Sequence, residues 1–127
     1  MSARAFLARF AQLRREVVRP VFDEVLPILR GRGHLCEIHE EEFAARPGGV
    51  STEASIRLRL APAGLDRPAR AEEQRELSFS TRSASRTVAI LNDRVPGGSE
   101  DIGRIDNKRV EDEVLKLMAA TVRPARA

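Results

Sequence analysis

The sequence predicts an α+β fold with two layers, in which a helix at each end of the chain packs on a four- to five-stranded, mainly antiparallel sheet. Apolar residues recur every three or four positions near both ends, as they do on one face of a helix. Between them, short segments alternate apolar and polar residues and are separated by Gly and Pro, as antiparallel strands are. Because 127 residues is the usual size of one domain, we expect a single α+β domain over residues 1–127.

The first helix is expected over residues 3–30. Its inner stripe consists of Phe6, Phe10, Leu13, Val17, Val21, Val25 and Leu29. Ser2 can cap its N-terminus, and Gly31 and Gly33 are typical stop signals. Pro20 lacks a backbone N–H and crowds the preceding turn, which predicts a kink. A break is disfavoured because Arg19 would be a poor cap for a second helix.

The length of this helix predicts self-association. It would be roughly 42 Å long at 1.5 Å per residue, whereas a strand of about six residues spans roughly 20 Å. We therefore expect the helix to extend past the sheet and to expose Phe6, Phe10 and Leu13. Pairing with a second copy commonly covers such a stripe, which predicts a homodimer. Alternatively, the chain turns at Pro20 and folds residues 3–18 back onto its own sheet.

Four strands are expected after Gly33, over residues 34–43, 54–60, 77–82 and 86–92. The clearest is 54–60, in which Ala54, Ile56, Leu58 and Leu60 point one way and Ser55, Arg57 and Arg59 the other. Residues 61–76 are rich in Pro, Gly and charge and predict a long connection. Pro96-Gly97-Gly98 predicts another turn, and the pattern allows a short fifth strand over 102–105.

The second helix is expected to begin at Asp106 or Asn107, either of which can cap it, with acidic residues in its first turns. Its inner stripe consists of Val110, Val114, Leu117, Met118 and Thr121. We expect one shared core that includes Ile56, Leu58, Leu60, Phe79, Val114 and Leu117.

Cysteine usage and hydropathy indicate where the protein works. The single Cys36 cannot form an intramolecular disulfide, which favours a reducing compartment, and we expect a cytoplasmic protein. No apolar run approaches the length of a membrane span, so no membrane partner is expected. Residues 1–15 are also rich in arginine and free of acidic residues, like a mitochondrial presequence, but the apolar stripe continues into residues 17–29. The scarcity of lysine relative to arginine is typical of a GC-rich genome and favours a bacterial source.

The charge distribution favours protein partners over nucleic acid. The net charge is only +3, and its sign alternates along the chain. Residues 1–20 hold five arginines and one glutamate, whereas residues 21–50 hold three arginines and six acidic residues. Such alternation suits self-association or acidic partners better than a uniform phosphate-binding surface.

His34, Cys36 and His39 are the candidates for a metal site or a nucleophile. Zinc needs about four converging ligands, but a strand places His39 on the opposite face from His34 and Cys36. The neighbouring glutamates oppose thiolate formation at Cys36. No nucleophile-elbow or phosphate-loop motif is present, so we expect no metal, no cofactor and no catalytic residue.

The candidate binding residues are arginines on the polar face of the sheet. Arg57 and Arg59 share that face, and Arg82 and Arg86 are expected on neighbouring strands, so the four could bind phosphate or carboxylate. The favoured function is a noncatalytic interaction or assembly module, with homodimer formation as one mode. The alternative is a nucleic-acid-binding or regulatory protein that uses the arginine face. A metal-dependent or thiol enzyme at Cys36 ranks third.

Overall fold

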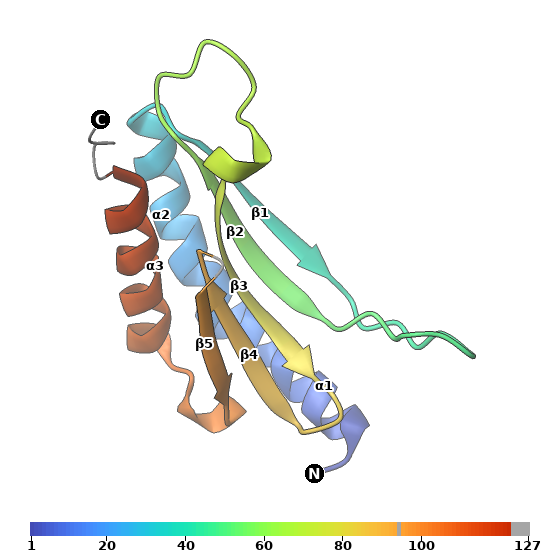
Figure 1. The fold of residues 1–127 in the computed structure, drawn as a ribbon. Helices are drawn as coiled ribbons and strands as arrows, with labels where there is room; N and C mark the ends of the chain where they lie inside the picture. The colour runs from blue at the N-terminus through green and yellow to red at the C-terminus, as the bar shows by residue number, and fades with distance from the viewer. Residues whose placement is uncertain (94, 123–127) are drawn as a thin grey trace.

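A computed structural model describes residues 1–93 and 95–122 and has the expected α+β order (Figure 1). A helical N-terminal segment is followed by five antiparallel strands in one open sheet with the order β1-β2-β3-β4-β5. The strands are β1 (Leu35–Glu41), β2 (Ser55–Ala61), β3 (Arg75–Arg82), β4 (Thr87–Asn92) and β5 (Val95–Glu100). The C-terminal helix α3 (Asn107–Val122) completes the domain, and the Asp106 carboxylate caps it by accepting from the Arg109 N–H at 2.9 Å.

The first helical segment is continuous through Pro20. It comprises α1 (Ala3–Leu13), one π-helical turn η1 (Arg14–Val18) and α2 (Arg19–Gly31). In the π turn, the Arg19 N–H donates to the carbonyl of Arg14, which lies five residues back. The wider turn lies just ahead of Pro20 and relieves the crowding that the proline ring causes in a regular helix. Gly33, at φ +89°, ends the segment as the sequence predicted.

The fifth strand differs from the prediction. Residues 102–105 do not form a strand, because Ile102–Arg104 is the 3₁₀ turn η3, whose three-residue period brings Ile102 and Ile105 to the core. Pro96-Gly97-Gly98, expected to turn the chain, instead lies within β5. An edge strand tolerates proline because only one of its sides is paired. Gly97 lies where the β4–β5 register shifts, and a Cβ there would be 3.1 Å from the Ile90 carbonyl oxygen.

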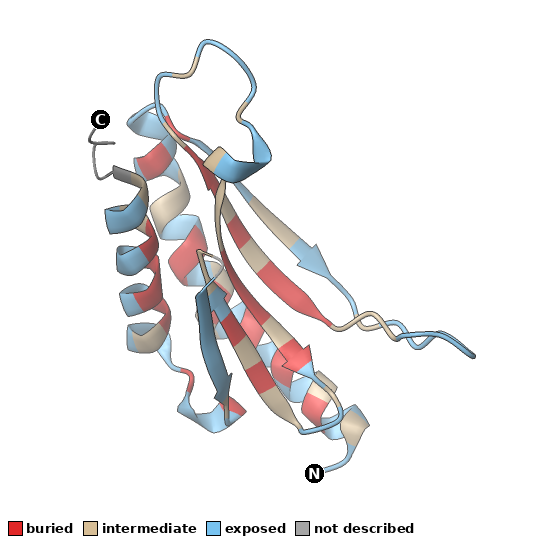
Figure 2. Ribbon diagram, viewed as in Figure 1, coloured by how far each residue is buried: buried red, intermediate tan, exposed pale blue. Residues whose placement is uncertain are grey.

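The two helical segments cover one face of the sheet. In Figure 1, α1 and α2 pass behind the strands, and α3 lies beside them. Buried and less buried residues alternate along β2, β3 and β4 in Figure 2, as strands with one covered face require. The predicted core set is confirmed, because all its members belong to one buried cluster: Ile56, Leu58, Leu60, Phe79, Val114 and Leu117. None of the helices in the described ranges is long and apolar enough to cross a bilayer.

The prediction of an exposed N-terminal stripe is wrong. Phe6 and Phe10 are fully buried and Leu13 is nearly so, all in the chain's own core. The strands are staggered, so the sheet is longer than any one strand: Ser80 pairs with the first residue of β2, and β3 then continues to Arg82. The N-terminal helix α1 also contacts η3. The sheet and η3 therefore cover the stripe without a fold-back at Pro20.

Candidate binding site on the uncovered sheet face

The uncovered face of the sheet carries a row of small side chains that crosses four strands. The register pairs Ser55 with Ser80, Ser80 with Ala89, and Ala89 with Ser99. In the neighbouring row, Arg57 pairs with Ser78, Ser78 with Leu91, and Leu91 with Pro96, so larger side chains lie on both sides of the small Ser78. The small side chains of Ser78, Ser80 and Ala89 are therefore adjacent and leave a groove between the larger ones.

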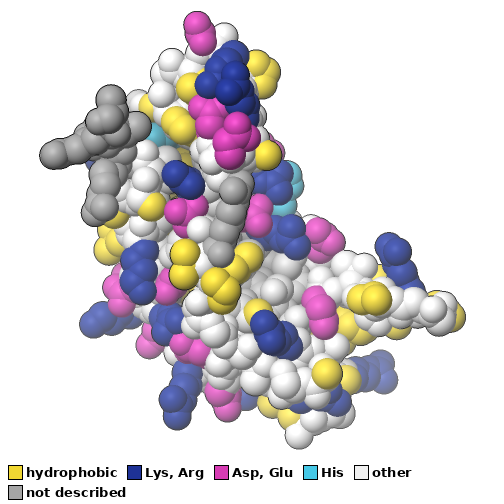
Figure 3. All heavy atoms as spheres, viewed as in Figure 1, with side chains coloured by type: hydrophobic (Ala, Val, Ile, Leu, Met, Phe, Trp, Pro, Cys, Tyr) yellow, Lys and Arg dark blue, Asp and Glu magenta, His cyan; other side chains and the backbone are white. Residues whose placement is uncertain are grey.

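This groove has a volume of about 490 Å³. Its floor is formed by Ser78, Ser80 and Ala89, and the other lining residues are Glu53, Arg57, Glu76, Thr81, Arg82, Leu91 and Pro96. Figure 3 views this face and shows positive, negative and hydrophobic side chains side by side on it. The groove therefore has apolar contacts from β4 and β5 at one end and charged groups from β2 and β3 at the other.

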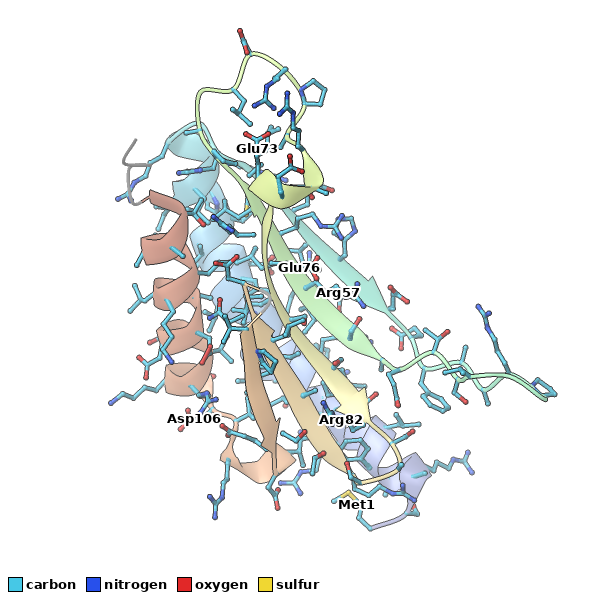
Figure 4. All side chains as sticks on the ribbon, in the orientation of Figure 1. Met1, Arg57, Glu73, Glu76, Arg82 and Asp106 are labelled. Atoms are coloured by element: carbon cyan, nitrogen blue, oxygen red, sulfur yellow. The ribbon has the colours of Figure 1, made fainter. Side chains whose placement is uncertain are left out.

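The two groove arginines have unused hydrogen-bonding capacity. The closest ion pair of Arg57 is a long one, 3.9 Å from its Nη2 to Oε1 of Glu41, and its buried Nε has no hydrogen-bond partner among the described residues. Arg82 is exposed, and no ion pair or hydrogen bond joins its side chain to a described residue. Figure 4 shows both residues along this face of β2 and β3. Both guanidinium groups can donate hydrogen bonds to a ligand oxygen.

The two groove carboxylates are already engaged. Glu53 accepts hydrogen bonds from the Thr81 hydroxyl at 3.1 Å and from the backbone N–H and hydroxyl of Ser83. Glu76 accepts from Arg59 at 3.1 Å. Among the charged groups of the groove, the arginines therefore keep more unused hydrogen-bonding capacity than the carboxylates.

The structure brings together only part of the predicted arginine set. Arg57 and Arg82 line the groove, while Arg59 lies on the same face outside it and is paired with Glu76. Arg86 lies in the β3–β4 turn at φ +58°, and its guanidinium donates to the Ser83 carbonyl. Sequence reasoning missed the contributions of Glu53, Leu91 and Pro96, which no local pattern marks.

His34, Cys36 and His39 do not converge. The His34 Nδ1 lies 3.0 Å from the Ala61 carbonyl oxygen, Cys36 is only 2% exposed in the core, and His39 pairs with Glu37 on the uncovered face. Burial raises the pKa of the Cys36 thiol to about 11, against a smaller opposing effect of Arg30. Within residues 1–93 and 95–122, no group of three or more His, Cys, Asp and Glu side chains is arranged to hold a metal ion.

Comparisons with protein-family models, with curated proteins and with solved structures find no match to this chain.

Proposed function

We propose that this protein is a noncatalytic interaction module that binds a partner protein on the uncovered face of its sheet. The observation that carries this proposal is the groove across β2–β5, which combines apolar contacts with two incompletely paired arginines. Grooves with a mainly apolar wall and a few well-placed polar groups are typical of binding sites.

The side chains around the groove favour a protein over a nucleic acid. The arginines of this face alternate with carboxylates, as in the Arg59–Glu76 and Arg57–Glu41 pairs, so the face lacks the row of unpaired cations with which a protein contacts several phosphates at once. The five phenylalanines, which are all of the chain's Phe, Tyr and Trp residues, pack within or against the core. Unpaired bases therefore have no aromatic stacking platform on this face.

The edges of the sheet are less suited to binding than its face. At the β1 edge, the Arg30 side chain donates to the Cys36 carbonyl at 2.9 and 3.2 Å, and Arg14 donates to the Glu41 carbonyl at 3.0 Å. At the other edge, Pro96 in β5 has no N–H to offer to an added strand. These features oppose strand addition and leave the groove as the better docking surface.

The test is site-specific photocrosslinking in extracts of the native host. A photoreactive amino acid at Ser80, on the groove floor, should yield a specific protein adduct, whereas one at Arg15, exposed on the helical layer, should not. The captured protein is then purified and its binding measured directly. Binding should be abolished by Ala89→Arg, which fills the groove, in a variant whose thermal unfolding shows an intact fold.

Two outcomes would contradict the proposal. Equal adducts from both positions would mean nonspecific contact, and a captured protein that still binds the Ala89→Arg variant would place the interface elsewhere. Capture of a second copy of this chain from Ser80 would identify the partner as the chain itself and establish a homodimer through the sheet face.

A further inference from the structure

We propose that the groove binds an extended acidic segment of its partner, with a carboxylate held by Arg57 and Arg82 and a nearby apolar side chain packed on Leu91 and Pro96. This inference rests on the proposed function and specifies the chemistry of the occupant. It concerns a segment in which an Asp or Glu lies two positions from an apolar residue.

The charge of the bound segment is inferred from which charged groups of the groove already have hydrogen-bond partners. Glu53 has three donors, from Thr81 and Ser83, and Glu76 is held by Arg59. By contrast, Arg57 Nε is buried without a hydrogen-bond partner in the described part of the chain, which is an unfavourable state, and the side chain as a whole is 37% exposed, so it can turn to donate to an incoming oxygen. The guanidinium fork matches a carboxylate, because it presents paired donors in one plane. A cationic segment would leave these donors unused and add repulsion.

The apolar half of the site consists of Leu91 and Pro96, which lie at the opposite end from Arg57 in the row of paired residues that crosses β2 to β5. Leu91 is 39% exposed although it lies within β4, and its cross-strand partner Pro96 is exposed in β5. Side chains paired in this way are close enough to form one apolar contact surface. Burying an apolar ligand side chain there removes both from water.

The spacing of the two halves determines the spacing of the recognised residues. Arg57 and Leu91 are separated by one strand, β3, so their backbones are roughly 10 Å apart at about 4.8 Å per strand. The Arg57 side chain shortens this distance. In an extended segment, side chains two positions apart point the same way and lie roughly 6.6 Å apart. A carboxylate and an apolar side chain with one residue between them therefore span the site.

The inference can be tested with synthetic peptides and amide NMR spectra of the isotope-labelled protein. The probe is the capped peptide Gly-Ser-Glu-Ser-Leu-Ser-Gly, and its controls replace Glu by Gln or by Lys. We expect the Glu peptide to shift the amide signals of Ser78, Ser80 and Ala89 in a saturable way. The Gln peptide should bind about tenfold more weakly, as expected for loss of a charge-assisted hydrogen bond. The Lys peptide should not shift these signals.

Protein variants test whether the groove arginines recognise the carboxylate of the peptide. Arg57→Gln combined with Arg82→Gln should lower the affinity for the Glu peptide at least about tenfold. The double variant should then bind the Glu and Gln peptides with equal affinity. Arg46→Gln removes one positive charge in the exposed β1–β2 connection, outside the lining of the groove, and should leave the affinity unchanged.

The results separate this inference from the proposed function. If the Lys peptide binds the groove as well as the Glu peptide, or if shifts appear away from the groove, the acidic-segment inference is overturned. It is also overturned if no peptide binds while Ser80 crosslinks a partner, in which case the proposed function still stands. If no peptide binds and Ser80 captures no partner, both are overturned.

Discussion

The Arg14 guanidinium donates from Nη1 to the backbone carbonyl of Ser55 at 3.3 Å, across 41 positions of sequence. The same nitrogen donates to the Glu41 carbonyl, while Nε lies 2.9 Å from a Glu40 carboxylate oxygen. Arg14 begins the π turn, and one side chain thus joins the helical layer to β1 and β2. Arg14 and Arg19 both pair with Glu40. Some of the charges whose alternation favoured binding partners in the sequence are therefore paired with each other within the chain.

Arg14→Leu should destabilise the fold by about 2 to 3 kcal/mol, because it removes the Arg14 donor from two backbone carbonyls and breaks the ion pair with Glu40. Urea unfolding followed by circular dichroism measures the loss. The matched control is Arg15→Leu, whose side chain is 71% exposed and should cost about 0.5 kcal/mol or less. Equal losses in the two variants would show that Arg14 does not connect the layers.

Cys36 should make stability fall at alkaline pH. Its pKa is raised from 9.0 to about 11 in the folded protein, so the folded state opposes ionisation of the thiol. The contribution is fully present below pH 9 and is lost as the pH rises from about 9 to about 11. The difference in unfolding free energy between wild type and Cys36→Ala, measured across this range, isolates the effect. A difference that is independent of pH would contradict it.

Phe10→Glu should prevent folding rather than only separate a dimer. Phe10 is fully buried within the chain's own core, so the substitution places an unpaired carboxylate there at a cost of about 4 kcal/mol or more. Circular dichroism and light scattering on both proteins check this. Ile28→Glu, at a residue 52% exposed on α2, is the control and should fold normally. If the wild type is a dimer and Phe10→Glu is a folded monomer, the hypothesis of a dimer formed through the first helix would be supported instead.

Nucleic-acid binding should be weak and nonspecific, with a dissociation constant no tighter than about 10⁻⁴ to 10⁻⁶ M at physiological salt. The reason is the modest net charge of +3 and the carboxylates beside Arg57 and Arg59. Fluorescence anisotropy with labelled single- and double-stranded oligonucleotides at two salt concentrations measures it. Tight, sequence-selective binding that is lost in both Arg57→Ala and Arg59→Ala would instead favour a nucleic-acid-binding protein.

Features that depend on local periodicity could be predicted from the sequence. The alternation in β2 separates Ile56, Leu58 and Leu60 from Arg57 and Arg59, and the structure has them on opposite faces. The capping role of Asp106 is local in the same sense. Pairing with distant segments was not predictable. Gly97 follows a proline and was expected in a turn, but in the structure it lies beside β4, where the β4–β5 register shifts around Ile90.

The sequence by itself determined that Arg57 and Arg59 point away from the core, because the direction of a side chain depends on the backbone of its own strand. Only the tertiary structure decided which of them share a site. Ser55, Ser80, Ala89 and Ser99 form one low row because hydrogen bonding aligns four strands in one register. A shift of one residue would turn each strand's side chains to the opposite face. The groove is a property of that register, which the packing of the whole core selects.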